Sequence, residues 1–280
     1  MQNFLVFQSL WGMEHLKGRA AELGLDEKLD LIAAEGFDGV SDHFYEPVHA
    51  GRLMRKLDAR GLRIEAQCFP VTIDDLKPVA ELATRYGAHH ITIQPDVRPR
   101  LFGESIRILE GWNRIAAECP VPVLVETHRG RMTNDMLQTL DLLDALPDLR
   151  LLADLSHYMV GREFPPLPVG AEIEQQVRAI LDRSWALHGR IASPGQVQVE
   201  LSLPQHRPLV DQFAAWWGHM MRSWRGRAGP EDSLSFLCEL GPRPYAISGV
   251  DGEDLTDRWA EALILRDLAR RIWAETANAA

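Results

Sequence analysis

The sequence predicts an α/β protein that forms a single (β/α)8 barrel, the TIM-barrel fold, as one domain over residues 1–280. Short apolar runs alternate with longer amphipathic runs eight times, which is the order of elements in this fold. The length of 280 residues is close to the roughly 250 residues typical of such barrels. No Gly/Ser-rich linker or block of charge divides the chain, so we expect one domain.

The expected strands are short and apolar, and glycines or a proline follow several of the expected helices. Thr133 is the expected N-cap of the fifth helix. An open, doubly wound sheet is the alternative, but the GxGxxG turn of its dinucleotide-binding version is absent after the first strand. The expected strands are residues 4–9, 37–40, 62–68, 90–94, 121–126, 149–154, 185–188 and 234–239, and the expected helices are residues 26–35, 47–60, 73–86, 104–119, 133–145, 172–181, 209–224 and 253–275.

The composition limits the classes of partner. A net charge of −10, with no compensating Lys/Arg block, disfavours binding to nucleic acid or to an anionic membrane. Three cysteines without a CxxC spacing are typical of reduced thiols, and no apolar run reaches the ~20 residues of a membrane helix. The apolar run at residues 4–10 lacks the flanks of a signal peptide. We therefore expect a cytoplasmic protein that acts on a small molecule, with a homodimer as the first assembly to consider.

Four neighbouring expected strands end in side chains that bind metals. The segments VLVETH, LLADLSH, WALHGR and FLCELG place Glu126, Asp154, His188 and Glu239 at the catalytic end of the barrel. Singly, Asp154 could be a helix N-cap and His188 a buried core histidine. Together, three carboxylates in one barrel mouth would repel one another, and a cation removes that cost. One divalent ion is therefore expected, and oxygen ligands with one imidazole suit Mn²⁺, Mg²⁺ or Co²⁺, with Zn²⁺ as an alternative.

These segments also resemble a known family. ETHRGR, ADLSH, LHGR and ELGPRPY, read over nearly the whole chain, resemble the xylose-isomerase-like TIM-barrel superfamily, which includes sugar phosphate isomerases and epimerases and ketose 3-epimerases. The resemblance implies that Glu126, Asp154, His188 and Glu239 hold one metal ion, and that the two glutamates are the acid and base. It also implies that His157 and Arg190 bind substrate oxygens.

Further side chains are candidates for the substrate pocket. His128 is a pocket residue or supports the metal ligands, His43 stands after the second strand, and Trp11 is the ring expected to face substrate. Arg129 and Arg131 suit an acidic or phosphorylated substrate, but pairing with Asp135, Asp141 or Glu163 at the surface is slightly favoured. Trp216, Trp217 and Trp224 are expected to pack on the barrel exterior or at a dimer interface, and the long segment 189–208 is typical of a lid or a subunit contact.

The residue types favour a metal-dependent isomerase or epimerase that acts on a sugar or sugar phosphate. Proton removal next to a carbonyl gives an enediolate, which a metal stabilises while Glu126 and Glu239 exchange protons. A lyase or dehydratase on the same scaffold is an alternative, and a sugar-binding barrel without turnover is another. A Schiff-base barrel needs a strand lysine, and no expected strand contains one. The superfamily that the chain resembles also includes the endonuclease IV branch, which has a trinuclear zinc site. That site is not expected here, because Gln94 stands near the position where that branch has a histidine.

Overall fold

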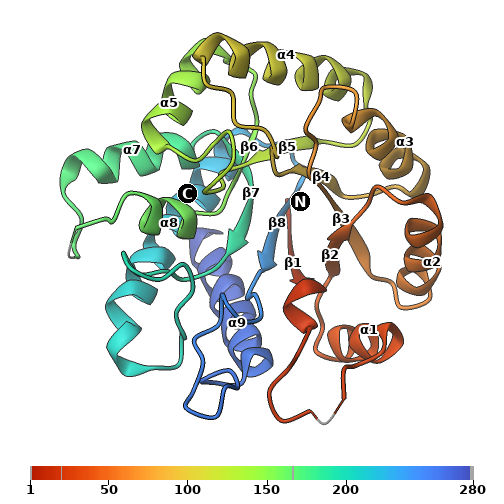
Figure 1. The fold of residues 1–280 in the computed structure, drawn as a ribbon, viewed down its shortest axis with the longest axis vertical. Helices are drawn as coiled ribbons and strands as arrows, with labels where there is room; N and C mark the ends of the chain where they lie inside the picture. Colours follow the sequence, from red (N-terminus) through yellow and green to blue (C-terminus); the bar gives the residue numbers. More distant parts are fainter. Residues whose placement is uncertain (1, 20, 166, 278–280) are drawn as a thin grey trace.

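The computed structural model describes residues 2–19, 21–165 and 167–277. It is a closed barrel in which each strand pairs in parallel with the strands before and after it, and the first strand pairs with the last (Figure 1). This confirms the predicted fold class. The strands are β1 (Asn3–Ser9), β2 (Gly39–His43), β3 (Arg63–Cys68), β4 (His90–Ile93), β5 (Val123–Glu126), β6 (Leu151–Ala153), β7 (Ser184–Gly189) and β8 (Ser233–Cys238).

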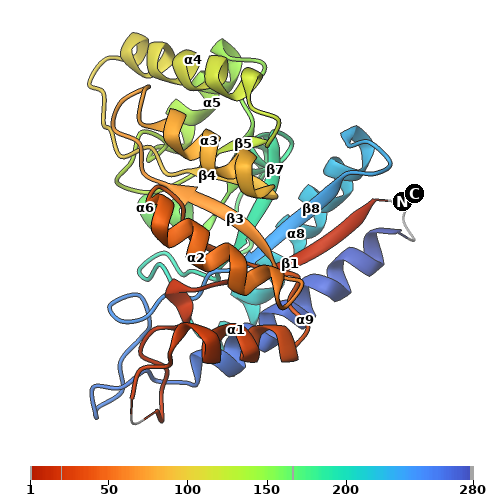
Figure 2. The same ribbon diagram turned by 90° about the vertical axis from the view of Figure 1, so that its right-hand side faces the viewer.

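Helices surround the barrel, and Figure 2 shows α9 alongside β1 and β8 on its outside. Trp273 of α9 stacks on Phe4 of β1, with ring centroids 5.0 Å apart. The α-helices are α1 (Leu25–Ala34), α2 (Pro47–Asp58), α3 (Leu76–Tyr86), α4 (Phe102–Glu118), α5 (Met136–Ala145), α6 (Ser156–Gly161), α7 (Ala171–Leu181), α8 (Arg207–Arg227) and α9 (Arg258–Ala277), with short 3-10 turns η1 (Trp11–Met13) and η2 (Pro204–His206).

The tryptophans of α8 belong to the hydrophobic core. Trp216, Trp217 and Trp224 are each at most 1% exposed. Trp217 packs edge-on against Phe236 of β8, with ring centroids 5.1 Å apart. This confirms the expected packing on the barrel exterior.

Three local expectations were wrong. The second strand is Gly39–His43 and not residues 37–40, because the backbone N–H of Phe37 still bonds Ile32 at the end of the preceding helix. The chain forms the additional helix α6 directly after β6. Thr133 does not cap α5: Asp135 does, by accepting from the Gln138 N–H, while the Thr133 hydroxyl donates to the Glu126 carbonyl.

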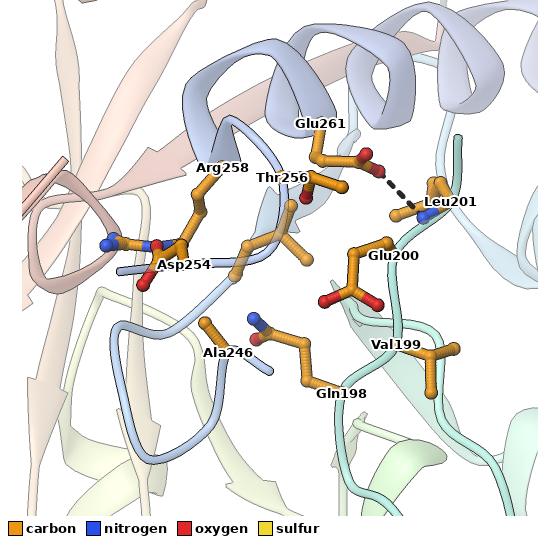
Figure 3. Close-up of a pocket in the computed structure, with 10 residues that line it drawn as sticks. Gln198, Val199, Glu200, Leu201, Ala246, Asp254, Thr256, Arg258 and Glu261 are labelled. Atoms are coloured by element: carbon orange, nitrogen blue, oxygen red, sulfur yellow. Dashed lines mark hydrogen bonds and ion pairs between the residues drawn. The ribbon is translucent and has the colours of Figure 1, made fainter. Parts of the chain in front are cut away.

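The segment between β7 and η2 is tied to the rest of the fold. The Glu261 carboxylate of α9 accepts hydrogen bonds from the Leu201 N–H and from the N–H and hydroxyl of Ser202. Gln198 exchanges two hydrogen bonds with the backbone of Gly241, after β8. Figure 3 shows Gln198, Leu201 and Glu261 among the residues around a cavity of about 20 Å³, with Glu261 reaching from α9 to Leu201. The segment is therefore anchored to the C-terminal helix and to the loop after β8.

We expect Glu261→Gln to lower the free energy of unfolding by about 1–3 kcal/mol, because a buried carboxylate that accepts from three donors becomes an amide with one acceptor. Urea unfolding measures the change. Glu253→Gln, at a side chain that is 50% exposed, is the matched control and should change stability little. Equal stabilities of the two variants would show that Glu261 does not anchor the segment.

Among the described residues, no helix has both the length and the apolar character needed to cross a bilayer.

Candidate metal centre and active site

The four predicted metal ligands converge at the C-terminal ends of neighbouring strands. Glu126 ends β5, Asp154 follows β6, His188 lies near the end of β7, and Glu239 follows β8. One ligand atom from each lies within 4.8 Å of the others. The side chains are 0–4% exposed. The parallel barrel brings them together because all its strands end on the same side.

The distances within this cluster suit a cation. His188 Nδ1 lies 3.7 Å from Glu126 Oε1 and 3.1 Å from Glu239 Oε2. Among the described residues, neither carboxylate oxygen of Glu126 has a hydrogen-bond partner, although both are buried. Buried carboxylate oxygens without a donor are strongly disfavoured unless a cation or a proton compensates them. Three carboxylates and one imidazole therefore form a donor set that fits one divalent ion.

The two carboxylate oxygens of Asp154 have different partners. Its Oδ1 accepts a hydrogen bond of 2.9 Å from the Ser156 N–H, at the start of α6. Its Oδ2 accepts one of 2.7 Å from Arg190, whose Nη2 also lies 2.6 Å from Glu239. Asp154 is therefore not the N-cap of α6, which is Leu155, although its Oδ1 accepts from the first N–H of that helix.

Without a cation, burial and neighbouring charges give the two glutamates very different pKa values. Burial raises the pKa of Glu126 to about 7, although His188 partly opposes the shift. Burial also favours a protonated Glu239, but Arg190 and His188 outweigh it and lower the pKa of Glu239 to about 2. Burial alone would lower the pKa of His188, yet Glu65, Glu239 and Glu126 raise it well above its usual value.

The apparent affinity for a divalent ion should therefore rise with pH. Ligation requires an ionised Glu126 and a neutral His188, whereas the metal-free cluster favours the protonated form of both, so the ion must displace protons. Between pH 6 and pH 8, across the pKa of about 7 for Glu126, affinity for Mn²⁺ should rise by at least about tenfold. Calorimetric titration in buffers of different ionisation enthalpy measures affinity and proton release together. A flat profile without proton release would contradict this.

A fifth buried residue, which the sequence did not indicate, contacts this cluster. Glu65, in the middle of β3, is 1% exposed, and its Oε1 lies 2.7 Å from His188 Nε2. The Thr92 hydroxyl donates to the same oxygen over 2.7 Å. Burial opposes its ionisation, but His188 and His90 hold the pKa of Glu65 below its usual value. An ionised Glu65 therefore accepts the Nε2 proton and leaves His188 Nδ1 facing Glu126 and Glu239, the carboxylate–histidine arrangement of many metal centres. The one sequence feature that could have identified Glu65 is its charge inside an otherwise mostly apolar strand.

This contact belongs to a polar column along the barrel interior. Glu65 Oε2 lies 3.5 Å from His90 Nε2, and His90 Nδ1 lies 2.8 Å from His89 Nδ1. His89 Nε2 then lies 2.7 Å from the Ser233 hydroxyl at the start of β8. Burial lowers the pKa of both His89 and His90. The column thus has two hydrogen-bonded parts, Glu65 with His188 and His90 with His89 and Ser233, and its two parts approach to 3.5 Å between Glu65 Oε2 and His90 Nε2.

The predicted substrate-binding residues fall into two groups. His157 is fully buried, with Nε2 3.4 Å from Asp154 Oδ2, and its ring lies 3.8 Å from that of His128. Trp11 and His43 line a separate hollow of about 280 Å³ beside β1 and β2. His157, His128 and Arg190 therefore adjoin the expected metal ligands. Trp11 and His43 line the neighbouring hollow, but Trp11 also packs edge-on against Tyr245, with ring centroids 5.0 Å apart, and Arg190 lies over that same ring.

Searches against known proteins show the fold of this chain and no close relative. No protein-family model matches it, and no curated protein does. A D-allulose 3-epimerase from Methylomonas sp. in complex with D-allulose has a similar structure, with a TM-score of 0.63 and 13% identity over 97% of this chain and 98% of that one. A xylose isomerase-like TIM-barrel protein from Mycobacterium smegmatis in complex with magnesium has a TM-score of 0.66 and 11% identity over 99% of both chains.

A third similar structure has a different activity in its description. The probable 3-DHS dehydratase involved in petrobactin synthesis from Bacillus anthracis has a TM-score of 0.53 and 16% identity over 95% of this chain and 99% of that one. The chain therefore shares the (β/α)8-barrel fold, over 95–99% of its length, with proteins described as a 3-epimerase, a xylose isomerase-like protein and a probable dehydratase. The choice between those chemistries therefore depends on the residues of the site and not on the fold.

Proposed function

We propose that this protein is a divalent-metal-dependent isomerase or epimerase that transfers a proton next to the carbonyl of a sugar or sugar phosphate. The observation that carries the proposal is the buried cluster of Glu126, Asp154, His188 and Glu239, whose ligand atoms lie within 4.8 Å of one another. The fold shared with D-allulose 3-epimerase supports it.

Each residue of the cluster has a part in this mechanism. Glu126, Asp154, His188 and Glu239 would hold the ion, which would supply Lewis-acid stabilisation of negative charge on the substrate oxygens. Glu126 and Glu239 stand on β5 and β8, with β6 and β7 between them, so they approach a bound substrate from different sides. One glutamate removes the proton next to the carbonyl, and the other returns a proton to the opposite face or to the neighbouring carbon.

Two further residues would orient the substrate. Arg190 is 2% exposed, and its Nε and Nη1 have no hydrogen-bond partner among the described residues. His157 is buried with both ring nitrogens unpartnered in the same part of the chain, and burial holds its pKa well below the usual value. These groups are available to bind substrate oxygens while the barrel walls exclude water.

Dehydration is the second candidate, because loss of a β-hydroxyl also begins with proton removal next to a carbonyl. The fold shared with the probable 3-DHS dehydratase favours it. Product analysis by NMR separates the two reactions: an isomerase or epimerase conserves the elements of water, whereas a dehydratase gives an unsaturated product.

The test combines metal content with proton exchange. Purified protein should contain about one divalent ion per chain by mass spectrometry, and His188→Ala should lose it. The loaded protein should exchange a proton next to the carbonyl of a ketose or ketose phosphate with solvent deuterium. Absence of metal after incubation with Mn²⁺, Mg²⁺, Co²⁺ and Zn²⁺ would refute the proposal.

A further inference from the structure

An open, arginine-lined hollow lies beside the metal-ligand cluster. Its volume is about 530 Å³, and Arg98, Arg129, Arg131, His128 and Tyr245 are among the residues that line it. None of its lining residues is acidic, although the chain as a whole carries a net charge of −10. We refer to this hollow as the arginine pocket.

The arginines of the pocket differ in their partners. Arg131 and Arg98 both pair with Asp96. For Arg129, the described residues include no carboxylate within ion-pair distance of the guanidinium. The expected surface pairing with Asp135, Asp141 or Glu163 is therefore wrong for both Arg129 and Arg131, because Asp96 takes Arg131 and Arg129 turns toward an aromatic ring.

The side chain and the loop of Arg129 are held in position. The guanidinium lies over the Tyr245 ring, 5.3 Å from its centroid. Gly130 adopts a left-handed conformation with φ of 66°, and its N–H donates to Asn134. The neighbouring His128 N–H donates to the Thr133 hydroxyl. A cation stacked on an aromatic ring in a braced loop loses little freedom when it binds an anion.

The arginine pocket is separated from the metal-ligand cluster by single side chains. The Tyr245 ring also lies 5.1 Å below the guanidinium of Arg190, which contacts Asp154 and Glu239. His128 lines the pocket, and its ring lies 3.8 Å from that of His157. The arginine pocket therefore lies next to the residues that would hold the substrate carbonyl.

We propose that the arginine pocket binds an anionic group of the substrate, a carboxylate or a phosphate, with Arg129 as its principal ligand. This rests on the proposed function, and it narrows the substrate class from sugars in general to sugar acids or sugar phosphates. A guanidinium presents paired donors that match the oxygens of either anion. A neutral ketose has no anionic group that could pair with Arg129.

Three ketoses of matched carbon skeleton test this with the metal-loaded protein. D-fructose is neutral, D-fructose 6-phosphate carries a phosphate, and D-fructuronate carries a carboxylate. Equilibrium binding by calorimetry should show that one anionic ketose binds at least about tenfold more tightly than D-fructose. The preferred anion identifies whether the pocket accepts phosphate or carboxylate.

Arg129→Gln should remove this preference, and Arg129→Lys should keep part of it because the charge remains without the fork. Arg207→Gln, an exposed arginine of α8 outside the pocket, is the matched control and should retain it. Equal binding of all three ketoses, absence of binding by both anions, or a preference unchanged in Arg129→Gln would overturn the proposal. The comparison of affinities does not require turnover, so failure of proton exchange alone refutes the proposed function and not the anion site.

Discussion

Replacement of Glu239 by glutamine is expected to lower proton exchange by about 10²- to 10⁴-fold, the usual contribution of a positioned acid or base. Glutamine removes the negative charge that lies 2.6 Å from Arg190 and 3.1 Å from His188 Nδ1, and with it the capacity to accept a proton. The rate of deuterium incorporation next to the substrate carbonyl measures the effect. Measuring exchange at saturating Mn²⁺ distinguishes loss of the catalytic base from loss of bound metal.

The control for this experiment is Glu253→Gln, an exposed carboxylate on the loop after β8. It should leave exchange and metal content unchanged. Normal exchange by Glu239→Gln at full metal occupancy would show that Glu239 neither removes nor returns the proton.

Glu65→Gln should weaken divalent-metal binding by about 10- to 100-fold, the typical effect of removing a hydrogen-bond partner of a ligating histidine. Glu65 accepts from His188 Nε2 and so fixes which nitrogen faces the other ligands. A glutamine amide in the same place is neutral, and it can turn its NH₂ group toward the histidine. Titration with Mn²⁺ or Co²⁺ measures the affinity, and the visible spectrum of bound Co²⁺ reports the ligand geometry.

A purely structural role for Glu65 would give a different result. Glu261→Gln is the matched control, because it also neutralises a buried glutamate, but one that bonds Leu201 and Ser202 and not a member of the cluster. It should lower stability and leave metal affinity unchanged. If Glu65→Gln loses only stability and binds Co²⁺ with the affinity and spectrum of the original protein, Glu65 does not position His188.

Alternation of apolar and amphipathic runs was enough to predict the barrel, because a buried parallel strand and a covering helix leave different periods in the sequence. Helix starts were harder to place. Thr133 and Asp135 are both acceptable caps, and only the fold shows that Thr133 is needed to hold the Glu126 carbonyl. The short helix α6 has too few residues for a periodic signal.

The predicted metal ligands were found from position alone, since carboxylates and imidazoles at strand ends must meet at one end of a barrel. Their roles as ligands remain a prediction. Glu65 was missed because it lies inside a strand, where only the three-dimensional packing shows that it reaches His188. The partner of Arg131 was also missed, because Asp96 is 35 residues away in the sequence.

The polar column from His188 to Ser233 changes what a substitution at the far end of this barrel means. In most barrels of this type, residues at the N-terminal end affect folding and leave catalysis alone. Here Ser233, His89 and His90 are hydrogen-bonded to one another, and His90 Nε2 lies 3.5 Å from the Glu65 carboxylate that contacts the expected metal ligand His188. We therefore expect the residues at positions 89 and 233 to vary together with the chemistry of the active site. Related barrels that bind another metal or catalyse another reaction should carry different residues at these two positions.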